Sequence, residues 1–347
     1  MSQFHLIYSA VSATIVLHCH RFVPRILTVE RGLVFMLEVV NSVLPVVVML
    51  LIGYLCREKK LISESGVEGL QALVMNFCLP ASLFCTFYKT SIGLSEAVLP
   101  AAFFIVTFGG IFAGMLLGKL FKISDRRLPF FLTGYEAGML GYALVAILIG
   151  DITTFGIMDV GHCLAIFTVY LAMLKGVNGE KQTTAQVIKG ILTTPVLVAI
   201  LAGAILGMTG IGGKIAASPA GSVVDTLCDF ISAPTAAAIL AVIGYRMKFA
   251  GLDRSKTLKI CGIRALEQAV FGVLVMALFH ALGGKFSSGT VIVSAAVMLT
   301  LPPPFILPLY TDDAESREFY SSAISLFTVI TIVCFAVLTA LKSAGMF

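Results

Sequence analysis

Three ionisable side chains lie inside otherwise apolar stretches of the sequence. Glu136 lies within residues 132–150, and Arg264 and Glu267 lie three residues apart within residues 259–281. A charge at the centre of a membrane helix costs at least about 2.5–3.5 kcal/mol, so each is a candidate for ligand binding or ion coupling. The spacing puts Arg264 and Glu267 on one helix face, where they could pair, and Glu136 could share the cation. Two interpretations stay open: a self-neutralising structural pair, or a coupling site in which Glu136 or Glu267 carries a proton or cation.

A cluster of prolines interrupts another apolar stretch, LTLPPPFILPLY at 299–310, which contains Pro302, Pro303 and Pro304 in succession. A proline inside a helix removes a hydrogen bond and costs about 3 kcal/mol. Irregular backbone at membrane depth is tolerated where it is packed in protein or lines a wet cavity. The prolines therefore predict a broken helix that faces a binding site, rather than a simple kink. The amino end of a half-helix suits an anion, and the carboxyl end suits a cation.

The composition indicates an all-α integral membrane protein. The chain has 347 residues, of which 58% are hydrophobic and 12% are charged, and its mean hydropathy is +1.00. A soluble domain carries about twice that share of charged residues. Lysines and arginines cluster in short loops, where they orient helices, so no basic surface remains for nucleic acid.

The sequence lacks the patterns that are typical of enzymes and of metal sites. The eight cysteines form no C-x-x-C pair and no disulfide framework, and HCH at 18–20 lacks the spacing of a zinc site. Neither a nucleophile with its base nor an H-E-x-x-H set is present. We therefore expect no enzyme activity, no metal and no cofactor, apart from coupling to H⁺ or Na⁺.

Ten apolar runs are candidates to cross a bilayer core, which needs about 20 residues per helix. They are residues 38–56, 67–89, 96–120, 128–149, 153–174, 186–208, 221–247, 259–281, 287–309 and 317–342. Sixteen lysines and arginines lie at the loops after the odd-numbered runs, and four lie on the opposite side. Because basic loops stay in the cytoplasm, we expect a multi-pass protein of the cytoplasmic membrane with both ends of the ten-helix core outside.

Residues 1–35 fit this arrangement poorly, because their apolar run is short and Arg21, Arg25 and Arg31 would lie outside. Three interpretations are open: an extra short helix, an uncleaved targeting-like segment, or an extension upstream of a chain that naturally starts at Met36. We favour the last, because the sequence from Met36 reads as an ordinary first span.

The ten runs divide into two sets of five, 36–174 and 186–347, with interruptions at matching positions. The second run of each set contains a proline followed by small residues, and the fourth runs are interrupted by glycines in one set and by prolines in the other. Five helices per set would give the two sets opposite orientations. Inverted repeats with such interruptions are typical of secondary transporters, whose binding site lies at the interruptions.

At these motifs the chain resembles the auxin efflux carrier family of membrane permeases, which includes bacterial malate and malonate permeases. LVMNFCLPASLF (73–84) is similar to the Leu-Pro motif of the family's second helix, and ISAPTAAAILAVIGYRM (231–247) to its counterpart in the seventh. EAGMLGYAL (136–144) occupies the Asn-x-Gly-x-x-Gly-x-Pro-Leu region of the fourth helix, and the segment that begins LPPPFILPLY (301–310) is similar to the broken ninth. The resemblance covers residues 36–347.

The resemblance implies ten transmembrane helices in two inverted five-helix repeats, with interrupted helices 4 and 9 that cross. Helices 1, 2, 6 and 7 would form a scaffold, and the others a moving bundle. It also implies a secondary active transporter that moves a small organic anion, usually a carboxylate, by an elevator-like alternating-access mechanism.

Two departures from the family pattern affect the site that the resemblance implies. Glu136 stands where the family often has Asn, and an ionised Glu136 would repel a carboxylate. Tyr142 stands where the family often has Pro, so helix 4 could break at Gly138 or Gly141, or only bend.

The candidate site residues lie at similar predicted depths, because Glu136, Arg264 and Glu267 are about as far into the membrane as Pro302. The substrate-binding candidates are Asn76, Gly138, Gly141, Arg264, Pro302, Pro303 and Pro304, and the coupling-ion candidates are Glu136, Glu267 and Gln268.

Two other functions stay open for the same ten-helix architecture. One is a sodium-coupled symporter of the bile-acid type, for which Glu136, Glu267 and Gln268 could supply cation ligands. The other is a receptor or scaffold that does not transport. The expected partners are a small organic anion, the lipid bilayer and, by analogy with elevator-like scaffolds, a second copy in a homodimer.

Overall fold

The structure is a computed structural model that describes residues 36–90, 93–177, 179, 183–249, 253–311 and 313–346. All regular secondary structure within these ranges is helical, as the composition predicted. The three interpretations of residues 1–35 fall outside the described residues.

Eight helices in the described part of the chain are long and apolar enough to cross a membrane. They are Met36–Glu58, Glu64–Tyr88, Ser95–Leu120, Leu128–Leu148, Thr153–Val177, Pro219–Arg246, Arg254–Leu282 and Ala314–Ser343. Two shorter apolar helices, α10 (Pro195–Met208) and α15 (Gly289–Thr300), fall within the predicted runs 186–208 and 287–309. Every predicted run therefore coincides with apolar helical structure, although only eight of the ten reach spanning length.

Several spans consist of shorter elements joined end to end. Glu64–Tyr88 comprises α2 (Glu64–Leu73), the π-helical turn η1 (Val74–Cys78) and α3 (Leu79–Tyr88). Thr153–Val177 comprises α7 (Thr153–Ala165), the π-helical turn η4 (Ile166–Tyr170) and α8 (Leu171–Val177), and Pro219–Arg246 comprises α12 (Pro219–Ser232) and α13 (Thr235–Arg246). The last junction lies at Pro234, whose ring nitrogen cannot donate the hydrogen bond that would continue α12.

The remaining long helices are α4 (Val98–Leu120), α14 (Arg254–Leu282) and α16 (Ala314–Ser343). Two shorter helices, α9 (Thr184–Thr193) and α11 (Ile211–Ala216), flank α10 in the chain.

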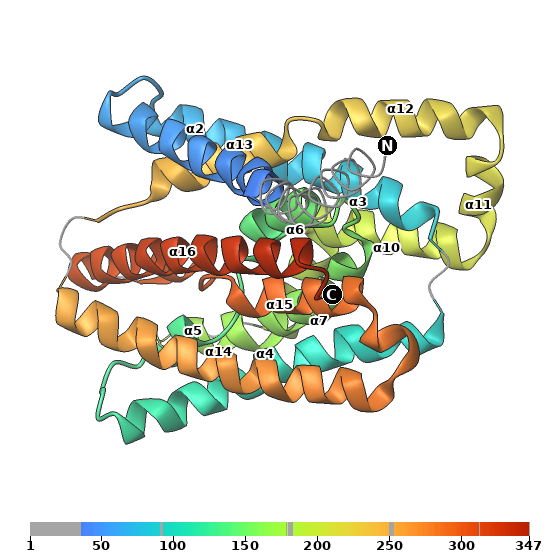
Figure 1. Cartoon of the computed structure of the whole chain (residues 1–347). Helices are drawn as coiled ribbons and strands as arrows, with labels where there is room; N and C mark the ends of the chain where they lie inside the picture. The colour runs from blue at the N-terminus through green and yellow to red at the C-terminus, as the bar shows by residue number, and fades with distance from the viewer. Residues whose placement is uncertain are drawn as a thin grey trace, which may run out of the picture.

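The helices pack in two groups. In the first group α3 packs on α10 and α12, and α2 packs on α13. In the second group α4 packs on α7, and α14 packs on α15 and α16. Figure 1 shows α2, α12 and α13 along one side of the molecule and α4 and α14 along the opposite side, with α6, α7 and α15 between them.

Small residues allow close approach within the first group. A Cβ atom on Gly53 would lie 2.0 Å from the carbonyl oxygen of Ala241, and one on Gly244 would lie 2.0 Å from the carbonyl oxygen of Leu50. Only glycine fits at either position, so the helix Met36–Glu58 and α13 are held backbone to backbone.

The span Leu128–Leu148 lies at the centre of the molecule, and it is broken. In the most apolar 18-residue stretch of this span 83% of the residues are buried, whereas in that of Met36–Glu58 only 17% are buried. It begins with α5 (Leu128–Leu132), passes through non-helical residues 133–136, and resumes as the π-helical turn η3 (Ala137–Gly141) and α6 (Tyr142–Leu148). The sequence suggested a break at Gly138 or Gly141, or only a bend. The segment does break, but the break precedes both glycines. It includes Gly134 at a φ of +78° that favours glycine.

The second break lies where the prolines predicted it. Helix α15 ends at Thr300, residues 301–304 are non-helical and buried, and the short 3₁₀ helix η6 (Leu307–Tyr310) follows. Both interrupted segments were expected from the sequence, and the structure places their breaks in direct contact.

Candidate functional site

The two broken segments cross through backbone hydrogen bonds. The backbone N–H of Glu136 donates to the carbonyl oxygen of Pro302 at 2.9 Å. In return, the backbone N–H of Phe305 donates to Oε2 of Glu136 at 2.6 Å. A Cβ atom on Gly134 would lie 2.9 Å from Cγ of Pro304, so the two broken segments are in contact at this point. Glu136 is thus a structural link of the crossing as well as a buried carboxylate.

Arg264, from α14, fixes the crossing from a fully buried position. One guanidinium nitrogen donates to the carbonyl oxygens of Phe131 and Leu132 at 2.7 and 2.6 Å. The other donates to those of Gly134 and Leu301 at 2.7 and 3.0 Å. The last carbonyls of a helix have no partner within it and carry partial negative charge, so the carboxyl ends of α5 and α15 suit a cation. Arg264 supplies that cation.

The ion pair that Arg264 and Glu267 could have formed, one of the two interpretations left open by the sequence, is not present in the described part of the chain. Among the described residues Arg264 forms no ion pair, and neither carboxylate oxygen of Glu267 has a hydrogen-bond partner. Glu136 does not share the cation either, because its carboxylate accepts from Phe305. Positions three apart share a helix face, but the terminal guanidinium nitrogens are directed to free carbonyls at the two breaks.

The other predicted residues lie at different distances from the crossing. Gln268 joins it, because its side-chain N–H donates to the Leu301 carbonyl oxygen at 3.0 Å. Gly141 packs closely, since a Cβ atom there would lie 2.5 Å from the ring of Phe155. A Cβ atom on Gly138 would lie 3.5 Å from Met75, an ordinary contact. Asn76 is exposed within η1 and does not line the cavity described next.

A cavity of about 830 Å³ opens beside the crossing. Its walls come from the helix Met36–Glu58, α2, α13, η6 and α16, so it lies between the two packing groups. Phe305 lines the cavity with its side chain while its backbone N–H holds Glu136. The volume falls within the range of about 300–1,000 Å³ that is usual for small-molecule sites.

Cations outnumber anions on the cavity wall. The charged residues there are Arg57, Arg246, Lys248, Arg317, Glu64 and Glu318. Arg57 donates to the carbonyl oxygens of Tyr245 and Met247 and pairs with Glu58 at 2.9 Å. Arg317 donates to the carbonyl oxygen of Thr311.

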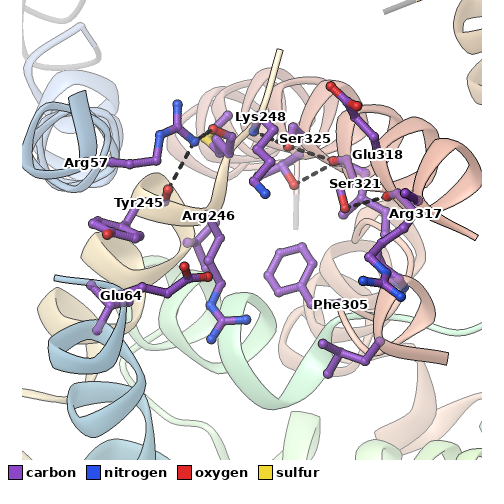
Figure 2. A pocket seen from close by; sticks show the side chains of 18 residues that line it. Arg57, Glu64, Tyr245, Arg246, Lys248, Phe305, Arg317, Glu318, Ser321 and Ser325 are labelled. Carbon is purple, nitrogen blue, oxygen red and sulfur yellow. Dashed lines mark hydrogen bonds between the residues drawn. The ribbon is translucent and has the colours of Figure 1, made fainter. Parts of the chain in front are cut away.

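Arg246 and Lys248 differ from these two, because no ion pair or hydrogen bond of their side chains is present among the described residues, and Nε of Arg246 is buried without a partner. Figure 2 shows both side chains extending into the space between α13 and α16, with the Phe305 ring beside them. Sequence reasoning missed both residues, because it counted them only as loop charges that set orientation. Their position at the end of a proline-interrupted span was the available signal.

A buried polar network behind the crossing was also missed. Nδ1 of His162 hydrogen-bonds to Asp159 at 2.9 Å, and the hydroxyl of Tyr142 donates to the same carboxylate at 3.0 Å. The backbone N–H of Tyr135 donates to Nε2 of His162 at 3.0 Å. Asp159 is completely buried in α7, so the criterion that selected Glu136 would have selected it too.

This network also contains a possible set of metal ligands. Ligand atoms of Asp159, His162 and Cys163 lie within 4.8 Å of one another. Both ring nitrogens of His162 and both oxygens of Asp159 are already hydrogen-bonded, so the arrangement fits a polar network that anchors Tyr135 and Tyr142 better than it fits a metal centre.

Comparison with known proteins gives the family. The chain is 24% identical over 308 residues to an uncharacterized transporter of Methanothermobacter thermautotrophicus, and the match covers 84% of this chain and 95% of that protein. Residues 38–341 match the family model described as membrane transport protein. The apolar helices, the crossing of two broken segments and this match over nearly all described residues agree. The chain is a multi-pass membrane protein that belongs to the membrane transport protein family, the auxin efflux carrier family that the sequence motifs resemble.

Proposed function

We propose that this protein is a secondary active transporter of a small organic anion, a carboxylate such as malate. The observation that carries the proposal is a pair of cations, Arg246 and Lys248, on the wall of a cavity that reaches the crossing, whose side chains have no partner in the described part of the chain. A guanidinium presents parallel N–H donors that match a carboxylate, and an ammonium adds a point charge. A dicarboxylate would engage both.

The arrangement of the helices supports an elevator-like mechanism. The cavity lies between the group that contains α2 and α13 and the group that contains α16 and the crossing. Arg246 belongs to α13 of the first group, so movement of the second group against the first would open the cavity between them to one side of the membrane and then to the other. In this proposal the ten helical segments form two inverted repeats, 36–174 and 186–347, and the cavity opens to the cytoplasm, where the basic loops are expected.

Glu136 does not prevent anion binding in this scheme. Its carboxylate accepts a hydrogen bond from the backbone N–H of Phe305, and Glu136 does not line the cavity. The anion would instead meet Arg246 and Lys248. A homodimer through the scaffold group remains part of the proposal and is tested by the mass of the purified protein in detergent.

Uptake into liposomes tests the proposal. Purified protein is reconstituted, and uptake of labelled malate, malonate and succinate is measured with imposed proton and sodium gradients. Saturable uptake that unlabelled malate competes and that Arg246→Gln reduces by about tenfold or more is the expected result. A protein that binds malate without any flux would be a receptor or scaffold. Absence of both binding and flux for every carboxylate would contradict the anion assignment.

A further inference from the structure

A second and much smaller chamber lies beside the first break. It is enclosed by Val106 and Gly110 of α4, by Thr133 and Tyr135 of the first break, and by Glu267 of α14, among others. The centre of a water molecule has about 10 Å³ in which to move there. The chamber therefore accommodates one water molecule or one ion of similar size.

Glu267 faces this chamber with an unsatisfied carboxylate. Its side chain is only 5% exposed, and both of its oxygens are buried without a hydrogen-bond partner in the described part of the chain. An isolated carboxylate in an apolar environment is strongly destabilised, so it must either take up a proton or coordinate a cation. Arg264 lies three residues away on the same helix but forms no ion pair with Glu267. Its terminal nitrogens are directed to four carbonyl groups, and its Nε is buried without a partner among the described residues.

Thr133 supplies a second unsatisfied oxygen at the same place. Its hydroxyl is buried and has no partner among the described residues. A Cβ atom on Gly110 would lie 3.0 Å from Oγ1 of Thr133 and 3.5 Å from Oε1 of Glu267, so both oxygens border the space that this glycine leaves open. Two independent polar side chains thus converge on a chamber of ionic size.

The surroundings of Glu267 contain few other charges. On its own helix Arg264 is the neighbouring cation and Gln268 the neighbouring amide, which is bonded to Leu301. From the first break Tyr135 faces the chamber, and α4 contributes only apolar or small residues to its lining. A single positive charge in the chamber would balance the carboxylate, whereas an anion would be repelled by it.

We propose that Glu267 and Thr133 form a binding site for one small monovalent cation, a sodium ion or a proton, that is separate from the anion cavity. The proposal rests on the proposed transport function, because there the cation would be the coupling ion. The chamber touches the first break, so its occupancy can alter the geometry of Thr133 and Tyr135, the residues directly before and after Gly134 in the crossing region. Binding of the cation would thereby be linked to movement of the bundle.

Two measurements on purified full-length protein test this site. The apparent melting temperature is measured in sodium chloride and in choline chloride at equal ionic strength, and malate uptake is measured with an imposed sodium or proton gradient. The variants are Glu267→Gln and Thr133→Val. The controls are Glu68→Gln, at an exposed glutamate, and Thr107→Val, at a buried threonine of α4 that does not line the chamber.

A sodium site predicts a higher melting temperature in sodium than in choline, because a ligand stabilises the state that it binds. A proton site predicts instead that only the proton gradient drives uptake. Either response should be lost in Glu267→Gln. For sodium, the half-saturating concentration should rise by about tenfold in Thr133→Val, and both controls should behave as the parent does.

The cation site and the anion proposal can fail independently of each other. If the parent transports malate but responds to neither gradient, or if Glu267→Gln keeps the full response, the chamber holds only water. A sodium response that is lost in Glu267→Gln, in a protein that binds no carboxylate, would keep the cation site and reject the anion assignment. Glu267→Gln that still binds malate in the absence of a gradient shows that the variant is folded.

Discussion

Arg264 and Arg246 carry the same side chain in two contrasting environments. Arg264 is fully buried, and its terminal nitrogens donate to four carbonyl oxygens at the ends of two half-helices. Arg246 lines a cavity, and no partner for its guanidinium is present among the described residues. A charged side chain deep in the membrane can therefore be held by hydrogen bonds within the fold, while one at the end of a span remains available to a ligand.

The largest expected effect is at Arg264. Arg264→Met would leave the carbonyl groups of Phe131, Leu132 and Gly134 without their donor, and breaking a buried charged network of this kind costs about 3–5 kcal/mol. We expect little folded protein by size-exclusion chromatography in detergent. Arg264→Lys should restore little, because an ammonium cannot reproduce the planar fork. Arg246→Met should elute as the parent does, and equal losses in both variants would remove the distinction between the two arginines.

The second largest effect is expected at Glu136, which is buried at the crossing and is hydrogen-bonded to the cavity-lining residue Phe305. Glu136→Ala would leave the backbone N–H of Phe305 unsatisfied, at a cost of about 1–3 kcal/mol. Glu136→Gln keeps a carbonyl acceptor and should retain most of the stability. Melting temperatures of the two variants measure this difference. If alanine and glutamine destabilise equally, the contact with Phe305 does not stabilise the crossing.

Arg246 itself should affect binding rather than folding. Arg246→Gln is expected to weaken malate binding by about tenfold, which corresponds to about 1.4 kcal/mol, with no change in melting temperature in the absence of malate. Arg246→Lys keeps the charge but loses the fork, so it should retain part of the affinity. A variant that binds malate normally but melts at a lower temperature would give Arg246 the structural role that we assign to Arg264.

The smallest effect is expected at an exposed end of the bundle. Asp313 begins α16, and hydrogen bonds from the side chain and backbone N–H of Ser316 hold the pKa of its carboxyl below the ordinary value of 3.8. A lowered pKa in the folded state gives stability that is present above the ordinary value and is lost as the pH falls through the lowered one. Asp313→Ala should cost about 1 kcal/mol at neutral pH.

Its pH dependence distinguishes this contribution from a loss of packing. The difference in melting temperature between the parent and Asp313→Ala should shrink as the pH is lowered into the acidic range, and Asp313→Asn should behave as a cap at every pH. A difference that does not change with pH would contradict the role of the carboxylate.

Much of the architecture was predictable because it depends on local chemistry. Three consecutive prolines cannot continue a helix, so the break after Thr300 followed from the sequence. Matching depths in the membrane indicated that Glu136, Arg264 and Pro302 would lie close together, and the structure joins Glu136 directly to Pro302 and Arg264 to Leu301. Apolar length was likewise enough to locate the eight helices of spanning length in the described part of the chain.

The details of the site depend on contacts between distant segments, which sequence spacing does not determine. The partners of Arg264 are carbonyl oxygens, which every residue possesses, so no sequence pattern marks them. The first break falls before Gly138 because Gly134 adopts a positive φ against Pro304, more than a hundred and fifty residues away in the chain. Arg246 can bind a ligand because no neighbouring side chain or carbonyl group in the described part of the chain hydrogen-bonds to its guanidinium, and sequence spacing does not reveal such an absence.

Malate binding to purified protein with altered cavity charge tests the central claim most directly. The double variant Arg246→Gln/Lys248→Gln is compared with Lys59→Gln/Lys119→Gln, which removes two exposed cations that do not line the cavity. Binding is measured by isothermal titration calorimetry at several salt concentrations. We predict that the cavity variant loses malate binding by more than about tenfold and that the control binds as the parent does. Equal affinity in both double variants would show that the anion, if it is bound, is held elsewhere.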